Sequence, residues 1–162
     1  MKSYFGKVGS IYQQGESQTL QFRISSLKDL SIIINHFNQY SLITQKKADF
    51  ELFKIALDLM NHKEHLTIEG IHKLIAIKAS MNLGLSEELK VAFPETIPVS
   101  RPIVEDQEIK DPNWLVGFTE AEGCFECVIS KSKTKTGFRV QLRFTLTQHS
   151  RDQPRPLGPM NG

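Results

Sequence analysis

The chain has 162 residues, enough for one domain with a hydrophobic core, and its 40% hydrophobic and 23% charged residues are ordinary for a globular protein. The net charge of +2 does not by itself indicate a nucleic-acid-binding protein, so any surface for DNA or RNA has to be locally basic. No apolar run is long enough to cross a membrane and the N-terminus lacks the apolar segment of a signal peptide, so nothing points to a membrane partner or to an oxidising compartment.

Residues Tyr4 to Ser25 are predicted to form a β-hairpin. Residues 13–16 are turn-like, and apolar and polar side chains alternate through residues 20–25, as in a strand with one buried and one solvated face. The polar face would carry Gln21, Arg23 and Ser25. Arginine and glutamine are the residue types that read guanine and adenine edges, although a solvated sheet face without a binding function has the same pattern.

Three amphipathic helices and one shorter helix are predicted from the three- and four-residue spacing of apolar side chains. The first follows Ser26, in a sequence that resembles a capping box, and runs to about Tyr40. The others are expected at Lys47 to Asn61, Thr67 to Met81 and Ser86 to Phe93.

Two histidines, His62 and His65, lie in the connection after the second of these helices. Their spacing differs from the His-Glu-x-x-His pattern of zinc proteases. We therefore expect solvated histidines in this connection rather than a metal site.

Residues 94–110 interrupt the helical pattern. They contain three prolines, four acidic residues and no apolar period. This composition is typical of an extended linker, so the chain is expected to consist of two units.

A short helix with closely spaced small residues is predicted directly after the linker. Asp111, followed by proline, supplies an N-cap, and Gly123 supplies a helix stop. Gly117 and Ala121 lie one turn apart, which would let a second helix backbone approach closely. Glu122 precedes the stop, where a carboxylate is disfavoured by the helix dipole unless a cation lies beside it.

A second hairpin is predicted from Phe125 to Ser132 and from Phe138 to Thr147, with a basic turn that contains Lys131, Lys133 and Lys135. A basic tip beside a ribbon of arginine, glutamine and threonine side chains suits a two-stranded reader of the DNA major groove. Cys124 and Cys127 would lie on opposite faces of the first strand and have no second pair of ligands, which disfavours both a zinc site and a disulfide between them.

The segment from Leu115 to Gly123, LVGFTEAEG, resembles the LAGLIDADG motif of homing endonucleases. Residues 3–6, 25–30, 61–66 and 147–149 also resemble the single-chain, two-repeat members of this family that fungal mitochondrial introns carry. The resemblance implies an α+β fold, in which a saddle of antiparallel β-hairpins backed by helices binds double-stranded DNA. It further implies hydrolysis of phosphodiester bonds with Mg²⁺ or another divalent metal, and a mitochondrial location.

The resemblance divides the chain into parts of two repeats. Residues 1–93 resemble the second half of repeat 1, residues 94–110 the linker, and residues 111–153 the motif helix and first hairpin of repeat 2. Residues 154–162 resemble no part of the family. We therefore expect an incomplete copy of a longer, monomeric enzyme, with one motif helix where the family has two.

The resemblance also implies roles for individual residues. Glu122, the last acidic residue of the motif, would bind the metal and act in catalysis, whereas Glu120 would be structural or would support the site without binding the metal. Lys46 would polarise the scissile phosphate, with Lys47 as the alternative position. The residues matching DNA-facing positions are Gln21, Arg23, Ser25, Cys124, Glu126, Val128, Ser130, Ser132, Arg139, Gln141, Arg143, Thr145 and Thr147.

Two other functions stay open at this stage. Some members of the family act on RNA, so the chain also fits a maturase that binds its host intron. The single motif helix fits a DNA-binding remnant without activity as well. Splicing of the host intron with and without the protein would separate the first of these from an endonuclease.

Overall fold

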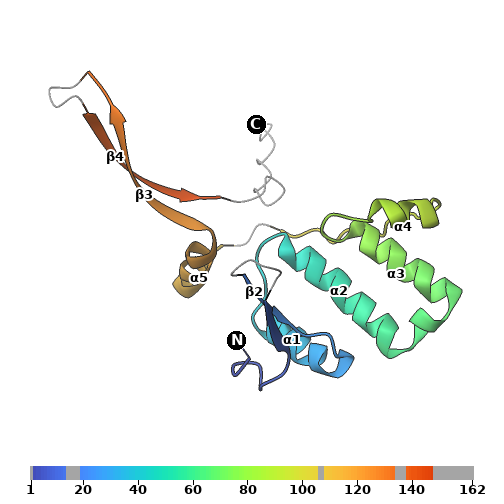
Figure 1. The fold of residues 1–162 in the computed structure, drawn as a ribbon. Coiled ribbons are helices and arrows are strands. Elements are labelled where there is room, and N and C mark those ends of the chain that lie inside the picture. Colours follow the sequence, from blue (N-terminus) through green and yellow to red (C-terminus); the bar gives the residue numbers. More distant parts are fainter. Residues whose placement is uncertain (1, 14–18, 106–107, 134–137, 148–162) are drawn as a thin grey trace, which may run out of the picture. The chain divides into compact units, whose positions relative to one another are not determined.

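The computed structural model describes residues 2–13, 19–105, 108–133 and 138–147. The chain divides into two compact units, Met1–Val104 and Glu105–Gly162, and the boundary falls inside the predicted linker. Each unit combines a two-stranded antiparallel hairpin with one or more helices (Figure 1), so the predicted α+β class is confirmed. Within the described residues, no helix combines the length and the apolar character that a membrane span requires.

The first unit begins with a short hairpin, in which β1 (Ser10–Gln13) pairs with β2 (Leu20–Arg23). The hairpin is shorter than predicted, because residues 2–7 form turns. Gly6 (φ 71°) and Lys7 (φ 67°) have left-handed backbone, which an extended strand excludes. Of the predicted turn, residues 14–16 lie outside the described part of the chain.

Four helices follow, each within one residue of its predicted bounds: α1 (Leu27–Gln39), α2 (Lys46–Asn61), α3 (Ile68–Ser80) and α4 (Glu87–Ala92). Thr67 and Ser86 cap α3 and α4, because their side chains accept hydrogen bonds from backbone N–H groups of the first turn. The predicted capping box at Ser26 is wrong, since its side chain makes no capping hydrogen bond. Asp29 stands where the box has a glutamate and is one methylene shorter.

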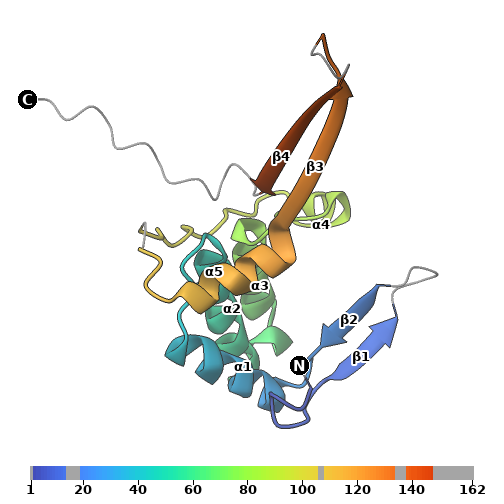
Figure 2. The same ribbon diagram turned by 90° about the vertical axis from the view of Figure 1, so that its left-hand side faces the viewer.

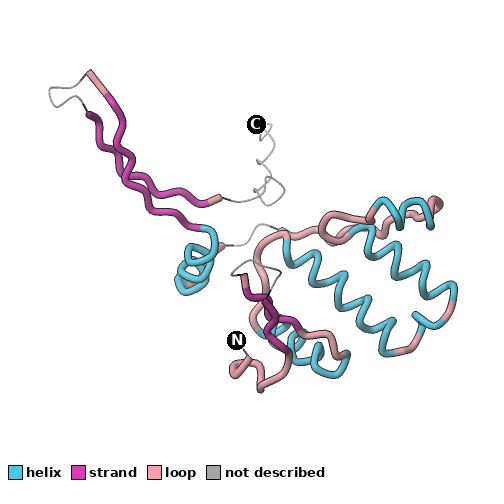
Figure 3. Tube along the Cα trace, viewed as in Figure 1, coloured by secondary structure: helices cyan, strands magenta, loops and turns pink. Residues whose placement is uncertain are grey.

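The core of the first unit lies between α2 and α3, which run side by side (Figures 1 and 3) and are joined through the 3-10 turn η1 (Glu64–Leu66). Gly70 lets η1 pack on α3, because a Cβ there would lie 1.9 Å from the Glu64 carbonyl oxygen. The buried apolar residues are Ala48, Leu52, Leu57 and Ile77.

The second unit consists of one helix and a long ribbon. α5 (Pro112–Glu122) leads directly into β3 (Gly123–Lys131), which pairs with β4 (Phe138–Leu146), as Figure 2 shows. β3 starts two residues earlier than predicted, because Gly123 has an extended backbone (φ −86°, ψ 144°) and opens the strand. None of the described residues of this unit is buried, and Leu142 is 80% exposed.

Candidate functional site

Glu122 is the last residue of α5 and stands at the base of the β3–β4 ribbon. Asp111 caps the start of this helix by accepting a hydrogen bond from the Asn113 N–H at 2.9 Å. At the other end, the Thr147 N–H donates to the Glu122 carbonyl oxygen at 3.5 Å, so the residue after β4 closes onto the end of the helix. The helix and both strands therefore fix the backbone of Glu122.

Gly123 makes this abrupt change from helix to strand possible. A Cβ at this position would lie 2.6 Å from the carbonyl oxygen of Thr119. Any other residue would force the strand away from the helix end. Gly123 is thus required because a Cβ would clash with the Thr119 carbonyl oxygen. The predicted helix stop would instead have needed a glycine with a left-handed backbone.

The carboxylate of Glu122 is exposed, and within the described residues it forms no ion pair or side-chain hydrogen bond. Glu120 is also exposed, but two residues along a helix correspond to a rotation of roughly 200°, so the two carboxylates point to different sides. A Cβ on Gly117 would meet nothing within 4 Å, so the small-residue face of α5 lies open in this unit.

An exposed carboxylate without an ion pair among the described residues, like that of Glu122, suits a hard divalent cation such as Mg²⁺, which also retains water ligands. Within the described residues, however, no three His, Cys, Asp or Glu side chains come together as a ligand set. Glu122 therefore fits as one ligand of a shared site, with the remaining oxygens supplied by water, by substrate or by a further carboxylate.

The ribbon has one polar and one apolar face, as predicted. Residues paired directly across two antiparallel strands lie on the same face. The cross-strand pairs of the polar face are Cys124 with Thr145, Glu126 with Arg143, Val128 with Gln141, and Ser130 with Arg139. Ser132 and Thr147 follow the ends of the two strands. The eight predicted contact residues within the strands therefore share one surface.

The apolar face lies on the other side of the ribbon. Phe125 and Phe144 stack there with 4.8 Å between ring centroids, and Cys127 pairs with Leu142. Cys124 and Cys127 are therefore on opposite faces, and both are free thiols. On the polar face, an Arg143 nitrogen lies 3.8 Å from a Glu126 oxygen, so the acidic residue partly neutralises an arginine of the same surface.

The first hairpin carries a second polar surface. Arg23 donates a hydrogen bond to the side-chain oxygen of Gln21 at 2.7 Å, and its guanidinium lies 5.4 Å from the ring centroid of Tyr12. Tyr12 pairs with Gln21, and Ser10 pairs with Arg23, so all four residues share a face. Ser25 lies beyond the end of β2.

Ser10 and Tyr12 also lie on this surface and were not predicted from the sequence. β1 has only four residues. A strand of that length gives too short an alternation to assign its faces without knowing the partner strand.

Lys46 is the first residue of α2 and lies beside a buried ion pair. Its ammonium donates to the side-chain oxygen of Asn82 at 3.2 Å and lies 3.9 Å from the carboxylate of Asp49. Asp49 is 6% exposed and accepts a hydrogen bond from Arg101 at 2.6 Å. Lys46 itself is exposed, whereas the alternative Lys47 is half-buried.

Burial raises the pKa of Asp49, but this effect is outweighed by hydrogen bonds from Arg101 and the Asn82 backbone and by the charges of Arg101 and Lys46. The pKa of the Asp49 carboxyl therefore lies below its ordinary value of 3.8. Asp49 is a charged group in the core, and the contacts of Lys46 depend on it. Asp49, Asn82 and Arg101 could not be predicted from the sequence, because they are far apart in the chain and form no local pattern.

The connector histidines differ from one another. His62 is exposed, and its Nδ1 lies 2.9 Å from the Asp58 carbonyl oxygen near the end of α2. His65 is half-buried, with an Nδ1 that has no hydrogen-bond partner, so the prediction of a solvated side chain holds for His62 only.

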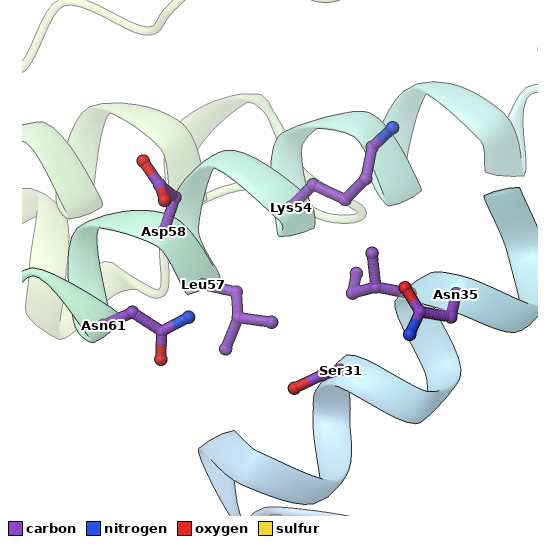
Figure 4. A pocket seen from close by; sticks show the side chains of 7 residues that line it. Ser31, Asn35, Lys54, Leu57, Asp58 and Asn61 are labelled. Atoms are coloured by element: carbon purple, nitrogen blue, oxygen red, sulfur yellow. The ribbon is translucent and has the colours of Figure 1, made fainter.

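A shallow groove separates α1 from α2 (Figure 4) but contains none of the predicted site residues. It is lined by Ser31, Ile34, Asn35, Lys54, Leu57, Asp58 and Asn61. Lys54 already forms an ion pair with Glu51 at 2.6 Å and donates to Asn38 at 3.3 Å. The positive charge of this groove is therefore compensated locally.

Fungal intron-encoded proteins resemble most of the chain. Probable intron-encoded endonuclease 3 of Neurospora crassa is 45% identical over 148 residues, which cover 91% of this chain and 28% of that protein. Probable intron-encoded endonuclease Cox1-I1b of Schizosaccharomyces pombe is 28% identical over 142 residues, which cover 88% of this chain and 32% of that protein.

Solved structures show the same fold. The I-SmaMI LAGLIDADG homing endonuclease bound to cleaved DNA has 48% sequence identity and a TM-score of 0.87, over 93% of this chain and 51% of its own. The LAGLIDADG meganuclease I-CpaMI bound to uncleaved DNA has 49% identity and a TM-score of 0.83, over 88% of this chain and 49% of its own. The chain thus spans about half the length of these two solved relatives. It spans less than a third of the length of the two curated relatives.

A family model described as LAGLIDADG endonuclease matches residues 1–57 and 115–156, which include both hairpins, Lys46 and most of α5. Because this match extends over more than half of the sequence, the chain belongs to the LAGLIDADG endonuclease family.

Proposed function

We propose that the chain is part of a site-specific endonuclease that hydrolyses double-stranded DNA with a divalent metal, and that Glu122 supplies one catalytic carboxylate. The observation that carries this proposal is the position of Glu122: its carboxylate is exposed and unpaired within the described residues, and its backbone is fixed at the junction of α5 with a ribbon that has a polar face. Relatives bound to DNA, I-SmaMI and I-CpaMI, support DNA as the substrate.

Each group has a separate task in this proposal. Glu122 would hold a divalent ion with a carboxylate oxygen, at the end of a helix that cannot shift without disturbing the Thr147 hydrogen bond. When bound, such an ion would supply Lewis-acid chemistry for phosphodiester hydrolysis. Lys46 presents an exposed ammonium that donates to a non-bridging phosphate oxygen.

The polar faces of the two hairpins are proposed to bind the DNA. Arg23, Arg139 and Arg143 are suited to bidentate contacts with guanine, and Gln21 and Gln141 to contacts with adenine. The alternating faces support this role, since the side chains that pair across one surface of each hairpin are mostly polar.

Mg²⁺ is the proposed metal, because carboxylate and phosphate oxygens with retained water are its preferred ligands. I-SmaMI bound to an uncleaved target in the presence of calcium ions supports a site for divalent cations in the family. We also propose a mitochondrial location, since the names of relatives refer to an ND4 intron and to Cox1.

The test uses the complete reading frame that contains this chain. The purified protein is incubated with Mg²⁺ and a plasmid carrying the uninterrupted host-gene sequence across the intron insertion site, and cleavage at one position is expected. Glu122→Gln should abolish cleavage and retain DNA binding, because it removes the charge but keeps the shape. Glu120→Gln is the matched control, as it alters the same residue type on the same helix, and it should cleave. Equal cleavage by the wild type and Glu122→Gln would show that the assignment is wrong.

The same purified protein can be tested for the two alternative functions, an RNA maturase and an inactive DNA-binding remnant. A maturase would accelerate splicing of the host intron RNA, and Glu122→Gln would leave that acceleration unchanged. A remnant would bind the DNA target with neither activity. The complete protein should sediment as a monomer, because we propose that it contains both catalytic carboxylates in one chain.

A further inference from the structure

Arg101 joins three segments of the first unit that are far apart in the sequence. Its Nη1 donates to Asp49 at 2.6 Å and to the Ser80 carbonyl oxygen at 2.8 Å, and its Nη2 donates to the Gln45 carbonyl oxygen at 3.1 Å. The guanidinium therefore connects the residues that follow α4 with the start of α2 and the end of α3. We call Arg101 and Asp49 the clasp.

Further hydrogen bonds hold the segment that carries Arg101. The Val99 N–H donates to the Ala76 carbonyl oxygen at 3.2 Å, and the Ser80 hydroxyl donates to the Val99 carbonyl oxygen at 2.5 Å. Part of the predicted linker is thus fixed to α3 rather than free. These residues and Asn82 lie outside the two stretches that match the family model.

A short series of contacts leads from the clasp to Lys46. The Asp49 oxygen that binds Arg101 also accepts from the Asn82 N–H at 3.0 Å. The side chain of Asn82 in turn accepts from the Lys46 ammonium at 3.2 Å. The other Asp49 oxygen has no hydrogen-bond donor and lies 3.9 Å from that ammonium.

We propose that Arg101 is a positioning residue for Lys46, because it pairs with the buried Asp49 carboxylate that would otherwise attract the lysine. The ammonium of Lys46 is then held by Asn82 and stays exposed to a phosphate. This inference rests on the proposed function, which assigns Lys46 to the scissile phosphate.

The positive charge of Arg101 is essential for positioning Lys46. A buried carboxylate needs a counterion, and Asp49 has two cations within reach, Arg101 and Lys46. Because Arg101 forms the direct hydrogen bond, Lys46 remains at 3.9 Å and binds Asn82 instead. Without the guanidinium, attraction by Asp49 would draw the ammonium inward, away from a bound phosphate.

The first test measures the state of Lys46 without DNA or cleavage. Full-length wild type, Arg101→Met and the double variant Asp49→Asn/Arg101→Met are labelled with trace amounts of a lysine-methylating reagent. Labelling of Lys46 relative to the exposed Lys28 is then read by mass spectrometry. Arg101→Met should lower the ratio severalfold, and the double variant should restore it, because no buried carboxylate then remains to attract the lysine.

The second test measures cleavage by the same variants in single-turnover conditions. Arg101→Met should lower the rate constant on the order of 10- to 100-fold, as misplacement of a catalytic group does, with little change in DNA affinity. Arg101→Lys, which keeps the charge but not the carbonyl contacts, should fall between wild type and Arg101→Met. The double variant should recover most of the rate. Lys90→Met, which removes an exposed ion pair with Glu87, is the control and should leave the rate unchanged.

The outcomes distinguish this inference from the proposed function. A double variant that is no better than Arg101→Met in both labelling and rate would overturn the positioning role and leave only structural stabilisation. If the labelling pattern follows the expectation but no variant, including the wild type, cleaves DNA, the clasp acts on Lys46 and the proposed function is wrong. Thermal unfolding of each variant shows which of them retain the fold.

Discussion

Glu126 and Arg143 face each other across β3 and β4 with 3.8 Å between carboxylate oxygen and guanidinium nitrogen, on the face proposed to bind DNA. The carboxylate competes with the DNA for the arginine and repels nearby phosphates. Glu126→Gln should therefore tighten binding to non-specific DNA by up to about fivefold, which corresponds to the roughly 1 kcal/mol limit of an exposed ion pair. Fluorescence anisotropy of a labelled duplex at several salt concentrations measures the change.

Arg143→Gln is the reciprocal variant and should weaken binding and reduce its salt dependence, because one phosphate-neutralising charge is lost. Weaker binding by Glu126→Gln to the specific target alone would mean that the carboxylate accepts a hydrogen bond from a cytosine amino group. Weaker binding to every duplex would contradict the repulsive role.

Tyr12 is predicted to prepare Arg23 for contact with a guanine. The ring lies 5.4 Å from the guanidinium, and Gln21 accepts a hydrogen bond from the same arginine, so two contacts restrict its rotamers. Tyr12→Leu should reduce affinity for the specific target by about 0.5–1 kcal/mol, the size of an exposed cation–π contact. Tyr12→Phe keeps the ring and should bind as the wild type does. Equal losses in both variants would assign the effect to the hydroxyl.

The two glycines of the motif should respond in opposite ways to alanine. A Cβ at Gly123 would lie 2.6 Å from the Thr119 carbonyl oxygen, whereas one at Gly117 would meet nothing within 4 Å. Gly123→Ala should destabilise the α5–β3 junction by about 1–3 kcal/mol, as overpacking does. Gly117→Ala should stabilise α5 by about 0.5–1 kcal/mol, because alanine is the better helix former.

Hydrogen exchange of the α5 and β3 amides measures both effects. In the complete protein, Gly117→Ala should also reduce cleavage if a second motif helix packs closely against α5. If Gly117→Ala instead speeds exchange of the α5 amides, another part of the protein already packs on this face of α5.

Much of the second unit could be predicted from the sequence, because its signals are local. The alternation in residues 138–147 fixes which side chains share a face, and the cross-strand pairing agrees with it. Asp111 and the proline after it mark the start of α5 to the residue. The start of β3 and the role of Gly123 differed, because close approach to Thr119 depends on a strand direction that the sequence does not specify.

The surroundings of Lys46 could not be predicted in this way. Asp49 and Arg101 are 52 residues apart, and both are ordinary charged residues that a sequence reading places at the surface. Their contact depends on the packing of α2 against α3 and on the path of the chain after α4. Tyr12 was missed for a related reason, since its face is defined only by the pairing with Gln21.

The buried carboxyl of Asp49 should make the stability of the first unit depend on pH. Its folded pKa lies below 3.8, so the unfolded chain binds the proton more tightly than the folded one. The stabilisation is therefore fully present above the unfolded value and is lost as the pH falls through the folded pKa. Urea unfolding between about pH 2 and pH 5 should show stability rising with pH in this window. Asp49→Asn should flatten that rise, whereas Glu88→Gln, on the exposed side of α4, should keep it. An equal slope in wild type and Asp49→Asn would mean that Arg101 does not hold the carboxylate in its charged form.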